Sequence, residues 1–539
     1  MNWDREKILN SIGFTLLGAC FAYSLFNVAT RTAREQDEEV VSIRFAHWQL
    51  EAGIRTAFDA VANEYMKLHP NVRVEQILIP ERVYPTWLTT RLVGQNPPDL
   101  VLLGIGMSDE RLARYFVPLT SEVAKPNPYN KGTDLEQVAW RDTFVDGLVT
   151  SPGIVNLFDY YGVPNSVSTI RLFYNKPLYQ KITGKTQPPR NYEELQGVFK
   201  AVQEYSKDLP DKQKVLAVAG SKYNSPILMD RLFASQTQKL TLALDRSNVL
   251  RVPTNPQIAF FDGLLDPRDP AMISALRLTR ELGQNMQTGF ISLAREDATF
   301  YFAQERALMI TSGSFDLASL VQESDFEVGV APIPLPDPQD PQFGEYVLGQ
   351  TSEAETGTNV PFGLAQDSKH PEIALDFLKF MTSQPSNRLF SHTSTWLPSV
   401  VGVEVPEVVE PFEPIQEGYP GGIMLRSSGG SEVVRIYDNA FYSLVSKDGS
   451  VEKFMDLFLP QYPQAMLRDG KLALKNSLRN VGRHDTTLSA LKALAVRGDD
   501  TAETKALRLA EIQARQETDY YQRRYAIWSY EQRMQKEKQ

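Results

Sequence analysis

Apolar residues near the start of the chain alternate between the period of a strand and the period of a helix. Residues 43–48 predict a short strand, and the following apolar positions recur three or four residues apart until Pro70, which predicts one apolar helix face. The pattern then predicts a strand over 72–79, a helix around 87–93 and a buried strand over 98–104. This alternation is typical of an α/β fold with a parallel sheet covered by helices. The apolar positions of the first helix are Ile54, Phe58, Val61, Tyr65 and Leu68.

The loops that follow the strands are the first places to expect a ligand. In open α/β sheets, ligands bind beyond the carboxyl ends of the strands. Here these loops are residues 47–51 and 104–106. We therefore expect the first binding residues in these two segments.

An apolar stretch over residues 12–29 follows a short charged head and contains the single cysteine, Cys20. The sequence Leu17-Gly18-Ala19-Cys20 resembles a bacterial lipoprotein box, which makes Cys20 a lipidation candidate. The alternative is an uncleaved membrane helix, because the stretch comes close to the ~20 apolar residues that cross a bilayer. Both alternatives predict an N-terminal membrane anchor and spacer over 1–40, with the remainder outside the cytoplasm.

Several segments carry a family resemblance. The run over 43–103, with an aromatic strand end, an amphipathic helix and Pro98-Asp99-Leu100, resembles the opening of the family 1 extracellular solute-binding proteins, the relatives of maltose-binding protein. Further segments match the family in the same order along the chain. These are residues 161–176, 188–195, 302–315, 326–334 and 368–383.

The resemblance implies a periplasmic-binding-protein-like fold of two discontinuous lobes, followed by a helical C-terminal extension over 481–539. It places 41–163 plus 328–395 in lobe 1 and 164–327 plus 396–480 in lobe 2, with hinge crossovers at Gly162 and Gly329. It also implies reversible binding without catalysis or a cofactor. The implied partners are a small-molecule ligand, in this family often a sugar, and the permease subunits and ATPases of an ABC importer.

Sugar binding needs flat aromatic faces for the ring and polar groups for the hydroxyls. The family places ligand contacts near Trp48, Phe315 and Trp396, whereas Trp87 lies on the predicted helix and is expected in the core. Two polar candidates have a structural alternative: His47 as a hydrogen-bonded strand end, and Glu51 as a charge at a helix N-terminus. The candidate ligand-binding residues are His47, Trp48, Gln49, Glu51, Glu81, Gly104, Asn165, Tyr223, Asn224, Ser314, Phe315, Gln350 and Trp396.

Charge and composition exclude several other classes of function. The formal charge is −10, whereas a nucleic-acid binder needs a basic surface to neutralise phosphates. The five histidines are never spaced as metal ligands on one helix face, and there is no second cysteine, so no metal site is expected. The segment Gly184-Lys185-Thr186 lacks the first glycine of a phosphate loop, because that position is Tyr179.

The last forty residues predict a long exposed helix, because residues 499–539 contain neither glycine nor proline. Tyr521, Tyr525 and Trp528 form a stripe on it at i, i+4 and i+7, which either packs on the protein's own surface or binds a partner.

Taken with the family resemblance, the sequence predicts a carbohydrate receptor that delivers its ligand to an ABC importer. The alternatives are a membrane-attached carbohydrate-active hydrolase, or a ligand-sensing scaffold that signals through the C-terminal helix.

Overall fold

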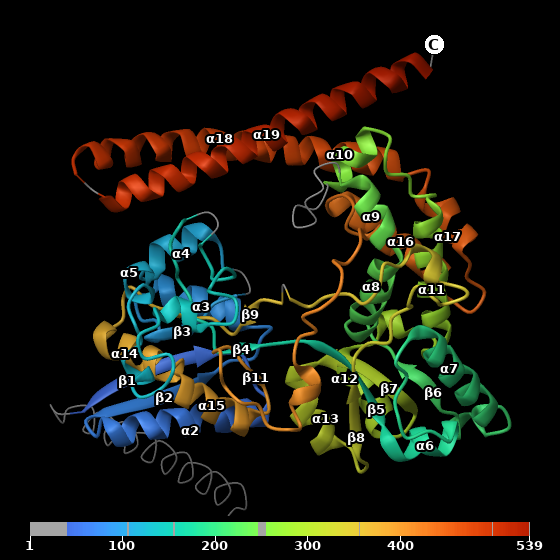
Figure 1. The fold of residues 1–539 in the computed structure, drawn as a ribbon, viewed down its shortest axis with the longest axis horizontal. Coiled ribbons are helices and arrows are strands. Elements are labelled where there is room, and N and C mark those ends of the chain that lie inside the picture. The colour runs from blue at the N-terminus through green and yellow to red at the C-terminus, as the bar shows by residue number, and fades with distance from the viewer. Residues whose placement is uncertain are drawn as a thin grey trace, which may run out of the picture. The chain divides into compact units, whose positions relative to one another are not determined.

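The computed structural model describes residues 40–104, 107–154, 157–245, 255–354, 356–498 and 500–537 (Figure 1). The chain divides into two compact, discontinuous units. Unit 1 comprises the described residues of Met1–Ser166, Thr358–Ser394 and Pro398–Glu404. Unit 2 comprises those of Val167–Gly357, Thr395–Leu397 and Val405–Gln539.

Unit 1 contains a four-stranded sheet in the order β10-β3-β1-β2, in which β1 is parallel to β2 and β3 and only β10 is antiparallel to its neighbour. The predicted succession of strand, helix, strand, helix and strand is confirmed. Its core is aromatic, since Phe45 of β1 lies within 6.0 Å, centre to centre, of the rings of Phe58, Phe362 and Phe377. The bounds are β1 Val41–His47, α2 Ala52–Leu68, β2 Val72–Leu78, α3 Tyr84–Val93, β3 Leu100–Leu102, α4 Asp109–Tyr115, α5 Thr120–Val123, β10 Phe362–Leu364, α14 Pro371–Met381 and α15 Gln384–Ser394.

Unit 2 contains a second four-stranded sheet in the order β6-β7-β5-β8, in which β5 is antiparallel to both of its neighbours. Residues 328–357, which we expected in lobe 1, belong to unit 2 because β8 pairs with β5. Gly329 is therefore a sheet residue, packed against the ring of Tyr174, and the chain leaves unit 2 only after Gly357. The strands are β5 Ile170–Asn175, β6 Leu216–Ala219, β7 Ala307–Gly313 and β8 Val328–Ala331.

Helices surround this second sheet, and three two-residue strands lie near the points where the chain passes from one unit to the other. The helices of unit 2 are α6 Lys176–Thr183, α7 Tyr192–Ser206, α8 Asn224–Gln236, α9 Gln238–Leu244, α10 Pro256–Phe261, α11 Pro270–Gln284, α12 Arg295–Ala303, α13 Leu317–Glu323, α16 Ser431–Val445 and α17 Val451–Phe458. The short strands are β4 Ser166–Val167, β9 Thr358–Asn359 and β11 Leu397–Pro398.

A buried arginine fastens a long loop of unit 2 to the sheet. Arg171 of β5 makes a two-point ion pair with Glu353, with both N···O distances 3.0 Å. The same guanidinium donates to the backbone carbonyls of Pro411 and Glu413, each at 2.7 Å. These acceptors compensate the loss of water around the buried charge, because a buried guanidinium without acceptors strongly destabilises the folded state.

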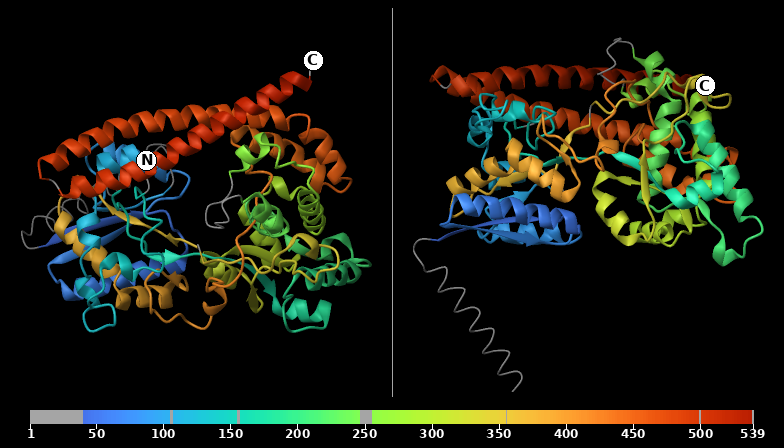
Figure 2. Two further views of the ribbon diagram at one scale, coloured as in Figure 1. Left: turned by 45° about the horizontal axis from the view of Figure 1, so that its top comes forward. Right: turned by 60° about the horizontal axis from the view of Figure 1, so that its bottom comes forward.

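The C-terminal extension is a helical hairpin of α18 Tyr462–Val496 and α19 Asp500–Glu537, which lie side by side and antiparallel (Figures 1 and 2). The predicted long helix is confirmed. Ala526 and Ile527 of α19 are buried, and Arg523 contacts Gln257 of α10. Tyr521, Tyr525 and Trp528 instead remain exposed, so the aromatic stripe does not pack on the protein in this structure.

The predicted N-terminal anchor, including Cys20, lies outside the described residues. Among the helices that the structure describes, none combines the length and the apolar composition that crossing a bilayer requires.

Candidate functional site

The end of β7 in unit 2 turns an aromatic side chain back over the strand. Gly313 is the last residue of β7, and Phe315 follows in the short 3-10 turn over Ser314–Asp316. A Cβ atom at Gly313 would lie 2.1 Å from Cε1 of Phe315, far inside van der Waals contact. The ring can therefore occupy this place only because residue 313 has no side chain.

Arg295, the first residue of α12, organises two aromatic rings at this strand end. Its guanidinium carbon lies 5.3 Å from the centre of the Phe315 ring and 5.3 Å from that of Tyr223. Attraction between a guanidinium and an aromatic face operates within about 6 Å. Arg295 is further held by an ion pair with Asp316, whose carboxylate also accepts a hydrogen bond from Ser312.

Trp396 completes this aromatic group from a distant part of the chain. Its ring centre lies 6.1 Å from that of Phe315, at an interplanar angle of 56°. Trp396 is almost fully buried, whereas Phe315 is partly exposed and Tyr223 is exposed. Tyr223 and Phe315 therefore offer ring surface to a ligand, and the buried ring of Trp396 packs against that of Phe315. We call Tyr223, Arg295, Phe315 and Trp396 the aromatic cluster of unit 2.

Two polar candidates beside this cluster are engaged within the protein. Asn224 is buried, donates to the backbone carbonyl of Thr311 at 2.7 Å and accepts from Ser221 at 2.6 Å. Ser314 is also buried, and its hydroxyl accepts from the backbone N–H of Thr169 at 3.4 Å. Both residues hold the loops that carry the aromatic cluster.

Gln350 is in a different part of unit 2. Its exposed side chain donates to the carbonyl of Thr351 at 3.2 Å. It lines a narrow cavity beside Arg171 and Glu353. The structure therefore groups Gln350 with the buried ion pair and not with the aromatic cluster.

In unit 1, Trp48 lies over the carboxyl ends of the parallel strands. Its ring meets that of Tyr84 edge to face, with centres 4.9 Å apart, and Tyr84 donates its hydroxyl proton to carbonyls of β1 and β3. A Cβ atom at Gly104 would lie 2.7 Å from Cη2 of Trp48. Gly104 thus leaves space for the half-buried indole, at the strand end where the sequence predicted it. Trp87, expected in the core, is only half-buried, and the guanidinium of Arg91 lies over its ring.

His47, beside Trp48, is fully buried and has partners on both ring nitrogens. Nε2 lies 2.9 Å from Oε1 of Gln76, and Nδ1 accepts from the backbone N–H of Gln49 at 3.2 Å. Because Nδ1 accepts, the ring proton is on Nε2, which donates to Gln76. Burial lowers the pKa of His47 to about 4, so the ring is neutral near pH 7. These contacts agree with the structural alternative, a hydrogen-bonded strand end.

The other candidates of unit 1 are dispersed. Glu51 is the N-cap residue of α2, Gln49 is half-buried beside His47, and Glu81 is exposed in the turn before α3. Asn165, which we assigned to lobe 2, is buried in unit 1, where its backbone carbonyl accepts from Asn387 at 2.9 Å.

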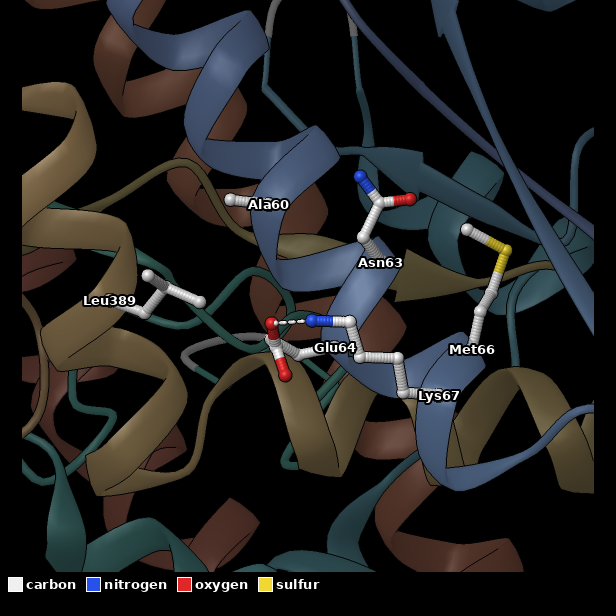
Figure 3. A pocket seen from close by; sticks show the side chains of 6 residues that line it. All are labelled: Ala60, Asn63, Glu64, Met66, Lys67 and Leu389. Carbon is white, nitrogen blue, oxygen red and sulfur yellow. Dashed lines mark hydrogen bonds and ion pairs between the residues drawn. The ribbon is translucent and has the colours of Figure 1, made fainter.

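A hollow on α2 lies away from the strand ends. It measures about 550 Å³ and is lined by residues of α2 and by Leu389 of α15 (Figure 3). At its edge, Lys67 and Glu64 of α2 form an exposed ion pair at 2.6 Å (Figure 3). It contains no aromatic face and no buried polar group. We therefore place the candidate site at the strand ends.

The site residues that sequence reasoning missed are Arg295, Asp316 and Tyr84. Arg295 and Asp316 are separated by twenty residues in the sequence, so no local pattern connects them. Tyr84 lies between Glu81 and Pro85 at a helix start, and nothing in the surrounding sequence indicates that its ring contacts Trp48. Within the described part of the chain, no group of histidine, cysteine, aspartate and glutamate side chains could hold a metal ion.

Known proteins resemble this chain in sequence and in fold. A family model described as bacterial extracellular solute-binding protein matches residues 61–410. Binding proteins of Brucella abortus (strain 2308) and Brucella suis (strain 1330) are 23% identical over 351 residues, which is 63% of this chain and 72% of theirs.

Solved structures with the same fold include several sugar receptors. The GacH receptor of Streptomyces glaucescens, studied with acarbose, is 17% identical, with a TM-score of 0.53 over 80% of this chain and 99% of that one. RafE in complex with raffinose is 16% identical, with a TM-score of 0.50 over 78% and 98%. A chitin oligosaccharide binding protein is 17% identical, with a TM-score of 0.50 over 79% and 99%. These similarities confirm the expected periplasmic-binding-protein fold.

Proposed function

Because this chain belongs to the bacterial extracellular solute-binding proteins, we propose that it captures a carbohydrate reversibly and without chemical change. Each unit carries one aromatic surface suited to a sugar ring, Trp48 in unit 1 and the aromatic cluster in unit 2.

The observation that carries the proposal is the aromatic cluster of unit 2. Sugar rings present apolar C–H faces that stack on aromatic rings, while their hydroxyls need planar polar partners. Phe315 and Tyr223 supply the ring faces, and Arg295 lies 5.3 Å from both with several N–H donors. Since Asp316 neutralises Arg295, the cluster suits an uncharged ligand better than an anion.

The solved structures of similar fold support a sugar in particular. Their names record acarbose, raffinose and chitin oligosaccharide as ligands. These three differ in their sugar units but share hydroxyl-rich rings, which is the chemistry that the aromatic cluster matches. We infer that the ligand is an oligosaccharide rather than an amino acid or a metal ion.

The test is calorimetric titration of the purified chain with a panel of neutral oligosaccharides. We expect saturable binding of at least one of them, weakened about tenfold or more by Phe315→Ala, since aromatic contacts contribute about 1 kcal/mol beyond their buried area. Tyr442→Ala, which removes an exposed ring on α16, is the matched control and leaves the affinity unchanged. Release of smaller sugars during the titration would instead indicate the hydrolase.

The proposed function also concerns where the chain is attached and which protein receives its ligand. We propose that residues 1–40 anchor the chain to the outer face of the cytoplasmic membrane, through lipid on Cys20 or through a membrane helix. Delivery to an ABC permease is then expected. Radiolabelled lipid on the wild-type chain, absent from Cys20→Ser, distinguishes the lipid anchor from the membrane helix.

A further inference from the structure

The helix α19 carries an exposed apolar face on the side away from its packed face. The exposed fractions are 68% for Leu507, 62% for Tyr521, 65% for Tyr525 and 56% for Trp528. Large apolar side chains gathered on one helix face mark an interaction surface. The rings of Tyr525 and Trp528 already contact one another, with centres 6.0 Å apart.

Between residues 507 and 528, helical geometry places six residues on this face, and the same arc continues at Glu503 and Gln532. At about 100° per residue, positions 507, 510, 514, 521, 525 and 528 lie within an arc of roughly 60°. The buried residues Leu509, Ala526 and Ile527 lie on the other side, toward the rest of unit 2. We call Leu507, Ala510, Ala514, Tyr521, Tyr525 and Trp528 the outer stripe.

The spacing of the outer stripe is symmetrical about its middle. Its intervals are three, four, seven, four and three residues, with the centre between Glu517 and Thr518. The side chains are not symmetrical in size. The first half contains Leu507 and two alanines, and the second half contains two tyrosines and a tryptophan.

We propose that the outer stripe binds the outer stripe of a second copy of this chain, with the two α19 helices antiparallel about a two-fold axis. In this register Tyr521 lies opposite Ala514, Tyr525 opposite Ala510 and Trp528 opposite Leu507 of the other copy. Each large ring then faces a small or flexible side chain, as close packing between helices requires. A two-fold interface uses the same patch on both copies, so one stripe must contain both the rings and the spaces for them.

The composition of the outer stripe also favours a protein partner over a lipid surface. None of its six residues is charged, and its first half contains the small side chains of Ala510 and Ala514. A membrane-bound helix gains most from a continuous large apolar face, whereas these two alanines interrupt the stripe between Leu507 and Tyr521. Alanines at the contact instead let two helices approach closely.

The register predicts a position-specific cross-link. Thr518 lies next to the two-fold axis and is exposed. In Thr518→Cys, the cysteines at position 518 of the two copies therefore lie within disulfide range of each other. Leu507→Cys is the matched control, because the two 507 positions are roughly 32 Å apart in this register at 1.5 Å rise per residue. The experiment is mild oxidation of the full-length chain in detergent, followed by non-reducing electrophoresis. The unaltered chain controls for Cys20.

The expected result is a dimer band for Thr518→Cys and none above the unaltered chain for Leu507→Cys. Cross-linking at both positions would indicate a parallel pair and overturn the proposed register. Cross-linking at neither position would overturn the pairing itself.

Sedimentation of the full-length chain tests the same surface without new cysteines. We expect Tyr525→Glu to weaken the dimer at least tenfold, whereas Tyr442→Glu, which changes a similarly exposed tyrosine on α16, leaves it unchanged. A wild-type chain that stays monomeric at tens of micromolar overturns the proposal. A monomer whose binding to vesicles of anionic phospholipid is lost in Tyr525→Glu overturns it in favour of a lipid surface.

Discussion

Gly313 and the ring of Phe315 compete for the same space, since a Cβ atom at Gly313 would lie 2.1 Å from Cε1 of Phe315. The backbone at Gly313 is ordinary extended chain, with φ −79° and ψ 160°, so an alanine there meets no torsional strain. The clash is between one methyl group and one aromatic ring. A substitution at Gly313 can therefore move the Phe315 ring while the backbone of β7 keeps its conformation.

Gly313→Ala should displace the Phe315 ring and weaken ligand binding by about 1–2 kcal/mol, a factor of roughly 5 to 30. Overpacking a buried site also lowers the free energy of unfolding, by about 1–3 kcal/mol. Gly197→Ala, in helix α7 where an added Cβ has nothing within 4 Å, is the control and should leave affinity unchanged. Calorimetric titration measures the affinity, and equal affinities for the two variants would contradict the role of Phe315.

Gly104→Ala should also displace Trp48, because the added methyl would lie 2.7 Å from the indole, and the φ of +157° at this position adds backbone strain. The smaller ring of Trp48→Phe should leave room for that methyl. The losses of affinity in Gly104→Ala and Trp48→Phe are therefore expected to be non-additive in the double variant. Strictly additive losses would show that Gly104 does not position Trp48 for the ligand.

His47 should make unfolding depend on pH. Burial lowers its pKa from the ordinary 6.5 to about 4, so between these values the unfolded chain binds a proton that the folded chain does not. This contribution to stability is complete above pH 6.5 and is lost as the pH falls toward 4. At pH 5 the loss from this residue is about 2 kcal/mol relative to pH 7.

The check is urea unfolding of the wild-type chain and of His47→Gln at pH 7 and pH 5. The wild-type chain should lose about 2 kcal/mol more than the variant between the two pH values. If both lose the same free energy, His47 is not the titrating group.

Arg171→Met should lower the free energy of unfolding by about 3–5 kcal/mol, because it removes the nearer cation from the buried carboxylate of Glu353, which keeps the more distant Arg231 at 3.4 Å and the backbone N–H of Ile415. Two backbone carbonyls of the 411–413 loop lose their donor as well. Arg190→Met removes an ion pair whose arginine is exposed, and is expected to change stability by less than about 1 kcal/mol. Thermal unfolding of both variants measures the difference, and similar shifts would contradict the account of Arg171.

Local periodicity was enough to predict much of the secondary structure. The alternation from β1 to β3 follows from the spacing of apolar residues, and the long helix α19 follows from a segment without glycine or proline. The resemblance to solute-binding proteins rests on the same kind of local segment, and the family comparison agrees with it. The sequence also placed Trp48 and Gly104 at the ends of neighbouring strands, because parallel strands end at one edge of a sheet.

Only the tertiary structure decided which side chains meet. Tyr223, Arg295, Phe315 and Trp396 come from four separate segments, and β8 joins the sheet of unit 2 although its sequence suggested lobe 1. The exposed stripe of α19 shows the same limit, because its periodicity predicts an apolar face but not what covers it. The periodic spacing of apolar residues indicates which side chains share one face of a helix or strand. Which distant segment packs on that face depends on the summed free energy of contacts that no local pattern contains.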